Sequence, residues 1–353
     1  MASRADEPPV TLGIESSCDE TSAAVLDRDG RPLANVVASQ IALHAPYGGV
    51  VPELAARAHL QNIRPVVAEA LRQSGTERRD LGLVAVTQGP GLIGSLLVGL
   101  SYAKAMARVL EIPVVGVNHL EGHFFSPFLE HPDIRFPLIA LVVSGGHSSL
   151  YYTPRFGTYE RLAATRDDAA GEAYDKVAKL LGLPYPGGPF IDRAASNWAG
   201  DGVAFAPPKI SDGSMDFSFS GLKTAVLYRV QKERIDAAAV PPAESPAVLA
   251  ILKGFQRTVV GHLLHRVRHF CLARRPRSLI LCGGVACNSE LRRRSIELGQ
   301  ELGIDVYHPS PEYTTDNAAM IAAAGRHAFV TGRRDSLCMN AFADLPLGAA
   351  PPG

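Results

Sequence analysis

The sequence has few of the residues that mark a secreted, disulfide-bonded or membrane-embedded protein. Its 353 residues include five cysteines, with no Cys-x-x-Cys pair. This sparse usage is typical of a reducing compartment and excludes a disulfide framework. The first nine residues have no apolar core, which excludes a secretory signal, and no uninterrupted apolar run is long enough to span a bilayer. We therefore expect a cytoplasmic protein with no membrane partner, a disordered tail at 1–9 and a second tail at the C-terminus.

Net charge is also absent. Lys plus Arg and Asp plus Glu each total 35, so the overall charge predicts no polyanionic partner. The distribution is uneven, because residues 251–300 hold ten Lys or Arg against two acids. This segment indicates either a solvated helix surface or a face for a phosphate backbone.

Two histidines, His119 and His123, stand four residues apart directly after an apolar run at 113–117. On a helix this spacing places both imidazoles on one face, about 6 Å apart at Cβ, within reach of one metal ion. The carboxyl end of a strand is also where α/β sheets place ligand sites. The pair predicts a metal site, with solvated or capping histidines as the alternative. Glu121 stands at the wrong offset for the zinc-protease helix, which disfavours a peptidase.

Two supersecondary patterns recur in the same order. A polar turn at 15–22 separates two short apolar strands. A similar polar turn at 144–149 follows another apolar strand. A strand, a glycine-rich turn and a helix follow later in each half, at 83–110 and at 278–302. The repetition predicts a duplicated α/β protein with a cleft between its halves. Backbone donors of the two hairpin turns and the two glycine turns are then expected to face a nucleotide.

Other segments combine acids with glycines. A helix that opens at 167–176 has acids in its first turn, and 185–192 is expected to be a constrained loop whose two glycines permit close backbone approach to a ligand. Asp316 precedes an Ala-rich helix at 318–329. Asp316 is either an N-cap or a third metal ligand.

Eight segments, taken in order, resemble one known family: 13–21, 48–59, 118–123, 143–147, 173–188, 217–224, 283–288 and 315–317. They are similar to the bacterial-type tRNA N6-adenosine threonylcarbamoyltransferases, a family formerly called glycoproteases. The resemblance covers about residues 10–340. Each motif is weak alone, whereas the ordered set is specific.

The resemblance implies a duplicated actin-like ATPase fold of the sugar kinase and heat-shock protein type. We expect an N-terminal lobe at 10–116, a C-terminal lobe with the metal site at 117–332, and a segment at 333–353 that returns to the first lobe. The implied activity is transfer of the threonylcarbamoyl group from threonylcarbamoyl-AMP to N6 of adenosine 37 in tRNAs that read codons beginning with A.

The resemblance also implies site residues and partners. The family's activity requires acids that match Asp19 and Glu20, and its metal ligands match His119, His123 and Asp316. Its nucleotide-binding positions fall on Val142, Val143, Ser144, Gly145, Gly146, Asp175, Gly188, Asp192 and Asn288. The implied partners are tRNA, a degenerate paralogue of the same fold and a small P-loop ATPase. We expect one divalent ion, Fe(II), with Zn(II) as the alternative, because both suit two nitrogens and a carboxylate.

The residues fit this chemistry. A carbamoyl-adenylate is a mixed anhydride with AMP as a good leaving group, so no enzyme nucleophile is needed, and no Ser-His-Asp or Cys-His set is evident. A Lewis-acid metal, a positioned amine and a carboxylate base, Asp19 or Glu20, would suffice. Two rival activities are a metal-dependent peptidase and an ATP-dependent kinase on the same fold. A non-catalytic tRNA-binding protein is disfavoured because both histidines are present.

Overall fold

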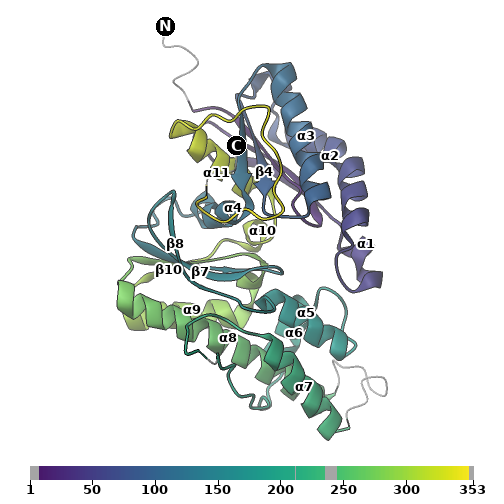
Figure 1. Ribbon diagram of the computed structural model, residues 1–353, viewed down its shortest axis with the longest axis vertical. Helices are drawn as coiled ribbons and strands as arrows, with labels where there is room; N and C mark the ends of the chain where they lie inside the picture. The colour runs from purple at the N-terminus through teal and green to yellow at the C-terminus, as the bar shows by residue number, and fades with distance from the viewer. Residues whose placement is uncertain (1–7, 211, 235–244, 350–353) are drawn as a thin grey trace. The chain divides into compact units, whose positions relative to one another are not determined.

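The chain forms two compact units. The computed structural model describes residues 8–210, 212–234 and 245–349 (Figure 1). Unit 1 contains the chain up to Asp133 together with the chain from Pro309 onward, and unit 2 is Ile134–His308. This division differs from the boundary expected at 116/117, because the two histidines and Asp316 belong to unit 1. Most of the expected tails, at 1–7 and 350–353, lies outside the described residues.

Unit 1 is built on a five-stranded sheet in the order β3-β2-β1-β4-β5. From β1 to β5 its strands are Thr11–Glu15, Glu20–Leu26, Pro32–Ser39, Leu83–Gly89 and Val114–Asn118. β1 is antiparallel to β2, as β2 is to β3, whereas β1, β4 and β5 run parallel. The polar turn expected at 15–22 is shorter than predicted, because Glu15 is the last residue of β1 and Glu20 the first of β2.

Helices cover both faces of this sheet. Side chains alternate along β1: Leu12 and Ile14 face the apolar cluster that includes α2 and α3, whereas Gly13 lies against Ala318 of α11. Figure 1 shows α2 and α3 side by side, with α11 across the sheet from them. The helices of unit 1 are α1 Ile41–His44, η1 Ala45–Tyr47, α2 Pro52–Ser74, η2 Arg78–Asp80, α3 Ile93–Leu110, α4 His119–Phe125, η3 Ser126–Leu129, α10 Pro311–Thr314 and α11 Ala318–Val330.

Unit 2 repeats the sheet. Its strands pair in the order β10-β9-β6-β7-β8, with β6 antiparallel to β7, β7 antiparallel to β8, and β6, β9 and β10 parallel. From β6 to β10 the bounds are Leu138–Val143, Ser148–Arg155, Thr158–Ala164, Ser278–Cys282 and Asp305–Tyr307. The match of order and direction is the duplication that the sequence predicts.

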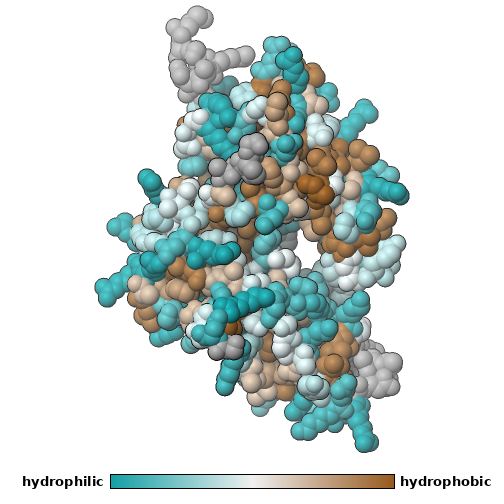
Figure 2. Space-filling view, viewed as in Figure 1, coloured by the Kyte–Doolittle hydropathy of each residue, from teal (hydrophilic) through white to brown (hydrophobic). Residues whose placement is uncertain are grey.

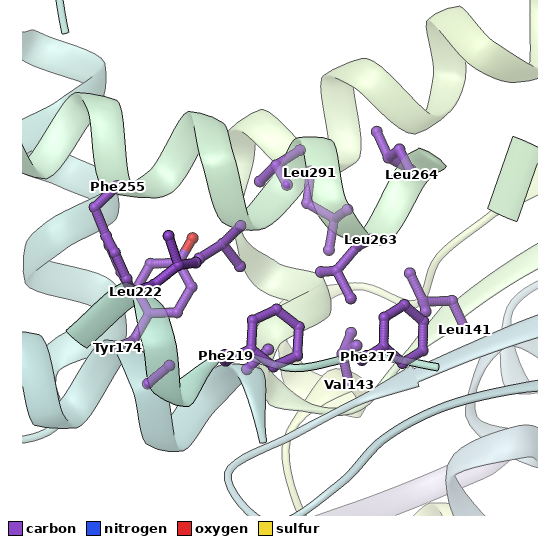
Figure 3. Packing of buried hydrophobic residues seen from close by; sticks show 14 of the residues in the cluster. Leu141, Val143, Tyr174, Phe217, Phe219, Leu222, Phe255, Leu263, Leu264 and Leu291 are labelled. Carbon is purple, nitrogen blue, oxygen red and sulfur yellow. The ribbon is translucent and has the colours of Figure 1, made fainter. Parts of the chain in front are cut away.

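The core of unit 2 is rich in aromatic side chains (Figure 3). Tyr174 meets Phe255 edge to face at 5.1 Å between ring centroids, and Phe217 stacks with Phe219 at 6.2 Å. The helices are α5 Ala170–Leu180, α6 Gly187–Asn197, α7 Ser220–Lys232, α8 Pro246–Arg274, η4 Gly284–Cys287 and α9 Ser289–Leu302. Because α6 begins at Gly187, the constrained loop expected at 185–192 is wrong for most of its length.

The C-terminal segment of unit 1, yellow in Figure 1, passes over β4 and α4. The Phe342 N–H donates to the Gln88 carbonyl at 2.9 Å, and the Asn118 side chain donates to the Leu345 carbonyl at 2.9 Å. The Gly91 N–H donates to the Ala343 carbonyl. The glycine turn after β4 therefore contacts this segment, and its Gly91 donor, expected to face a nucleotide, is already used.

Two described helices, α3 and α8, have the length and apolar composition that could cross a membrane. Helices in the cores of globular proteins share both properties. Much of α8 is buried in the apolar core of unit 2, and Lys104 of α3 donates to the Met339 carbonyl of the C-terminal segment. These contacts account for both helices within their own units.

Candidate functional site

Local sequence explains how the two histidines are presented. Every residue of β5 is buried, and its last residue, Asn118, caps α4 by accepting hydrogen bonds from the N–H groups of Leu120 and Glu121. A Cβ added to Gly122 would lie 2.7 Å from Ile321 of α11. The glycine between the histidines therefore permits the close packing of α4 on α11.

This packing brings three potential ligands together. The Oδ1 atom of Asp316 lies 3.2 Å from Nε2 of His123 and 3.5 Å from Nε2 of His119. One ligand atom from each of the three side chains lies within 4.8 Å of the others. Capping of α11 falls to Asn317, whose side chain accepts from the Met320 N–H. The alternative interpretation of Asp316 as that cap is therefore wrong.

The donor set fits a divalent ion. Both histidines are buried, with His123 fully inaccessible to solvent, so the solvated-histidine alternative does not apply. Nδ1 and Nε2 of His123 form no hydrogen bond among the described residues, although Nε2 lies 3.2 Å from Oδ1 of Asp316. A buried imidazole without a hydrogen bond costs free energy unless a ligand such as a metal ion binds it. Two imidazole nitrogens and one carboxylate oxygen form a ligand set that Fe(II) and Zn(II) both accept.

Glu15 supports this cluster from β1. Its carboxylate accepts hydrogen bonds from the Ser17 N–H at 2.5 Å and the Thr87 hydroxyl at 2.6 Å, and its Oε2 lies 3.0 Å from Nδ1 of His119. Burial opposes ionisation of Glu15, but its interactions with His119 lower the pKa of the carboxyl overall. Burial likewise disfavours the imidazolium, yet the carboxylates of Asp316 and Glu15 raise the pKa of His119 to about 9.

The two predicted catalytic acids lie beside the cluster. Burial, together with the negative charges of Asp19 and Asp316, raises the pKa of Glu20 to about 10. Without a cation the Glu20 carboxyl therefore keeps its proton at neutral pH. The turn that carries Asp19 is held by buried His59, whose ring nitrogens engage the Thr21 hydroxyl at 2.8 Å and the Cys18 carbonyl at 2.9 Å.

In unit 2 the predicted nucleotide positions fall on the turns and helices around the end of β6. Val142 and Val143 are buried in β6, Ser144 is almost buried, and Gly145 and Gly146 are exposed. A Cβ added to Gly171 of α5 would lie 2.6 Å from the Ser144 carbonyl. The first turn of α5 therefore packs directly on this predicted phosphate turn.

The remaining positions lie around α6, and two of them, Asp192 and Asn288, belong to one polar network. Asp175 accepts from the Gly187 N–H at 2.7 Å, next to Gly188 at the start of α6. Asp192 and Asn288 are joined by the buried side chain of Gln256 in α8. Gln256 donates to Asp192 at 3.0 Å and accepts from Asn288 at 2.8 Å. The network fixes which end of the Gln256 amide faces each partner.

The comparisons with known proteins identify the family. The family model described as tRNA N6-adenosine threonylcarbamoyltransferase matches residues 31–323. The chain belongs to this family. A relative from Pelobacter propionicus with that name is 48% identical over 95% of this chain and 96% of its own length. Another from Geotalea uraniireducens is 51% identical over 89% of this chain and 90% of its own.

Solved structures confirm the fold. The activator of the 2-hydroxyisocaproyl-CoA dehydratase from Clostridium difficile, solved with bound ADPNP, superposes with a TM-score of 0.52 at 15% identity. The superposition covers 91% of this chain and 96% of that one. The duplicated actin-like ATPase fold expected from the sequence is therefore confirmed. Family membership makes the chain a transferase that modifies tRNA, as predicted.

The structure adds two residues that no sequence motif indicates. Glu15 was expected in a polar turn but is fully buried beside His119. Gln256 lies within a long apolar helix and carries no motif of its own. Only contacts between positions far apart in the chain reveal either residue.

The arginines of the 251–300 segment are largely engaged within unit 2. Arg268 pairs with Glu301 at 2.5 Å and Arg293 with Glu297 at 2.6 Å, while Arg274 pairs with Glu160. Buried Arg266 donates to the Asp216 and His262 carbonyls. These contacts favour a solvated helix surface over a free basic face.

Proposed function

We propose that this transferase moves the threonylcarbamoyl group of threonylcarbamoyl-AMP to N6 of adenosine 37, in tRNAs that read codons beginning with A. The acceptor amine forms a bond to the carbamoyl carbon, the bond from that carbon to the phosphate oxygen breaks, and AMP leaves with the electron pair. The amine proton passes to a carboxylate. The observation that carries the proposal is the buried convergence of His119, His123 and Asp316 beside two acids, in a chain of this family.

The metal site would hold one divalent ion on His119, His123 and Asp316. We propose Fe(II), with Zn(II) as the alternative, because both accept two nitrogens and an oxygen while leaving positions open. When bound, the ion supplies Lewis-acid stabilisation of negative charge. The protein's own part is to hold three ligand side chains that are already close together.

Asp19 is our candidate for the general base, and Glu20 is its neighbour in the same acid pair. Asp19 ends the turn between β1 and β2, one residue before β2 begins, and its carboxylate can accept the amine proton. His59 holds the Cys18 carbonyl and the Thr21 hydroxyl on either side of these acids. This support limits movement of the base, as direct attack by a weak amine nucleophile requires.

Unit 2 would hold the adenylate part of the donor. The exposed glycines Gly145 and Gly146 offer backbone N–H groups for phosphate, and Asp192 and Asn288 are polar groups suited to the ribose or base. The dehydratase activator that shares this fold was solved with bound ADPNP. An adenine nucleotide in this chain is consistent with that likeness of fold.

The expected partners remain part of the proposal: tRNA, a degenerate paralogue of the same fold and a small P-loop ATPase. Unit 1 exposes Leu60 of α2 and Ile93 and Leu97 of α3, at 69%, 48% and 49% of their surface. Figure 2 shows brown patches over α1, α2 and α3 on this face of unit 1. Exposed apolar side chains on packed helices suit a protein partner better than tRNA. We place the reaction in the cytoplasm, where tRNA is modified.

The decisive experiment is reconstitution. Wild-type protein, loaded with Fe(II) or Zn(II) and supplied with threonylcarbamoyl-AMP, both protein partners and unmodified tRNA, should yield threonylcarbamoyladenosine and AMP, measured by mass spectrometry of nucleosides. Asp316→Asn and Asp19→Asn should each reduce the rate by about 100-fold. Glu121→Gln, on the same helix as the histidines but outside the ligand group, should not.

Two results would overturn the proposal. One is absence of modified nucleoside with wild-type protein whose metal content and tRNA binding are intact. The other is metal-dependent cleavage of casein or a glycoprotein by the same preparation, which would favour the peptidase alternative.

A further inference from the structure

We propose that Glu15 is a positioning residue that fixes the ring of His119 so that Nε2, and not Nδ1, is its metal-ligating atom. The inference rests on the metal site of the proposed function and adds a residue outside its ligand set. It follows from the hydrogen bonds that Glu15, the last residue of β1, forms with His119 and with its other neighbours.

The two ring nitrogens of His119 lie at unequal distances from carboxylate oxygens. Nδ1 lies 3.0 Å from Oε2 of Glu15 and 3.2 Å from the Ser17 hydroxyl, whereas Nε2 faces Asp316 at 3.5 Å. A carboxylate only accepts hydrogen bonds, so in the neutral ring that binds a metal ion the one remaining proton is held on Nδ1 by the nearer carboxylate, Glu15. That arrangement leaves the Nε2 lone pair directed toward the group that His123 and Asp316 share.

Glu15 is itself held on its other sides. The Ser17 N–H and the Thr87 hydroxyl donate to its two carboxylate oxygens, so the carboxylate cannot turn away without losing both bonds. The turn after it is packed tightly, because a Cβ added to Gly91 would lie 2.6 Å from the Ser17 carbonyl and one added to Gly99 would lie 2.3 Å from the Ser16 hydroxyl. A fixed carboxylate on a rigid strand end can impose one ring orientation, which a surface carboxylate could not.

The test variant is Glu15→Gln, which keeps the shape of the side chain but replaces the strong acceptor. The matched control is Glu121→Gln, the same change of charge on the helix that carries both histidines, at a residue outside the ligand group. Affinity of the full chain for Zn(II) is measured by competition with a chromophoric chelator. Glu15→Gln should weaken binding by about 10- to 100-fold, the range typical of residues that orient a metal ligand. Glu121→Gln should stay within about twofold of wild type.

A second measurement needs no substitution at Glu15. In Zn(II)-saturated wild-type protein labelled with ¹⁵N-histidine, the His119 signals should show a metal-bound Nε2 and a protonated Nδ1. The signals are assigned by their loss in His119→Gln. Bonding through Nδ1, or Zn(II) affinity unchanged in a folded Glu15→Gln protein, would overturn the inference while leaving the proposed function standing. Absence of Zn(II) binding to wild type, or equal binding by His123→Asn, would instead overturn the metal site and this inference with it.

Discussion

The two units contain the same sheet topology, but each shifts the pKa of a buried histidine in the opposite direction. In unit 1, carboxylates of Asp316 and Glu15 overcome burial and raise the pKa of His119 to about 9. In unit 2, burial and the charges of Arg266 and His265 lower the pKa of His262 to about 3. The His119 ring is therefore surrounded by groups that attract a cation, whereas His262 is a neutral core residue that packs edge-on against both Phe217 and Phe219.

The two units also differ in the residue that ends the first strand of each sheet. The strand that opens each sheet ends at Glu15 in unit 1 and at Val143 in unit 2. Glu15 places a buried negative charge behind the histidine, and Val143 leaves the corresponding turn without one. Equal topology thus permits a side-chain metal site in one unit and a backbone-lined, largely uncharged turn in the other.

The strongest way to test this contrast is to remove a ligand from unit 1 alone. His123→Asn should reduce metal affinity by roughly 100-fold or more, above the effect of residues that only orient a ligand. Elemental analysis after dialysis measures the bound metal. Binding of AMP, assigned to unit 2, should change little. Equal metal content in variant and wild type would show that His123 of unit 1 is not a metal ligand.

The corresponding disruption in unit 2 is Gln256→Leu. It removes the amide that joins Asp192 to Asn288 and leaves both side chains without that partner. We expect AMP affinity to fall about tenfold, since losing one hydrogen-bonded connection of this kind costs about 1–2 kcal/mol. Calorimetry measures the affinity, with Gln231→Ala, at an exposed position of α7, as the control. Reduced metal content in Gln256→Leu would contradict the independence of the two sites.

The convergence of His119, His123 and Asp316 agrees with the predicted ligand set, whose signal in the sequence is local. The spacing of His119 and His123 appears within five residues, and Asp316 precedes a recognisable helix. Glu15 could not be predicted in the same way. A glutamate after an apolar run resembles the start of a turn, and its partners Thr87 and His119 are 72 and 104 positions away. Only the folded sheet brings them together.

In unit 2, too, contacts between distant positions decide the structure of residues whose local sequence indicates otherwise. The residues Gly187, Gly188 and Pro189 indicate a loop by propensity. They begin α6 because Asp175 accepts from the Gly187 N–H and helix packing supplies the rest. Gln256 resembles a surface residue of an amphipathic helix, yet it is buried among partners 64 and 32 positions away. The repeated order of strands is predictable because each hydrophobic pattern is local.

A smaller effect is expected from the titration of His262. Its pKa is lower in the folded chain than in the unfolded chain, so the unfolded state binds the extra proton as pH falls. Stability of unit 2 should therefore be complete above about pH 6.5 and decline toward pH 3, with a slope of up to ~1.4 kcal/mol per pH unit. The charged and titratable groups whose charges shift the pKa of His262 are Arg266, His265 and Asp167.

His262→Gln should make this decline shallower, because the amide oxygen can still accept from the Ser218 N–H, as the ring does at 3.3 Å, but does not titrate. Urea unfolding is followed at several pH values by fluorescence of Trp198, the single tryptophan, which lies in unit 2. Exposed His269 supplies the control, His269→Gln. If the unfolding free energy of His262→Gln depends on pH as steeply as that of wild type, the titration of His262 does not cause the loss of stability.

The smallest effect is expected at Cys18, in the turn beside the metal cluster. Burial and the neighbouring acids Asp19, Asp316 and Glu20 raise the pKa of its thiol, so a nucleophilic thiolate is disfavoured. The group that the fold uses is the backbone carbonyl of Cys18, which engages His59. Cys18→Ser keeps that carbonyl and should retain turnover within about twofold, because direct attack on a mixed anhydride needs no covalent intermediate. Intact-mass measurement during turnover should detect no acylated cysteine, and a trapped threonylcarbamoyl thioester would replace the direct-transfer mechanism with a two-step one.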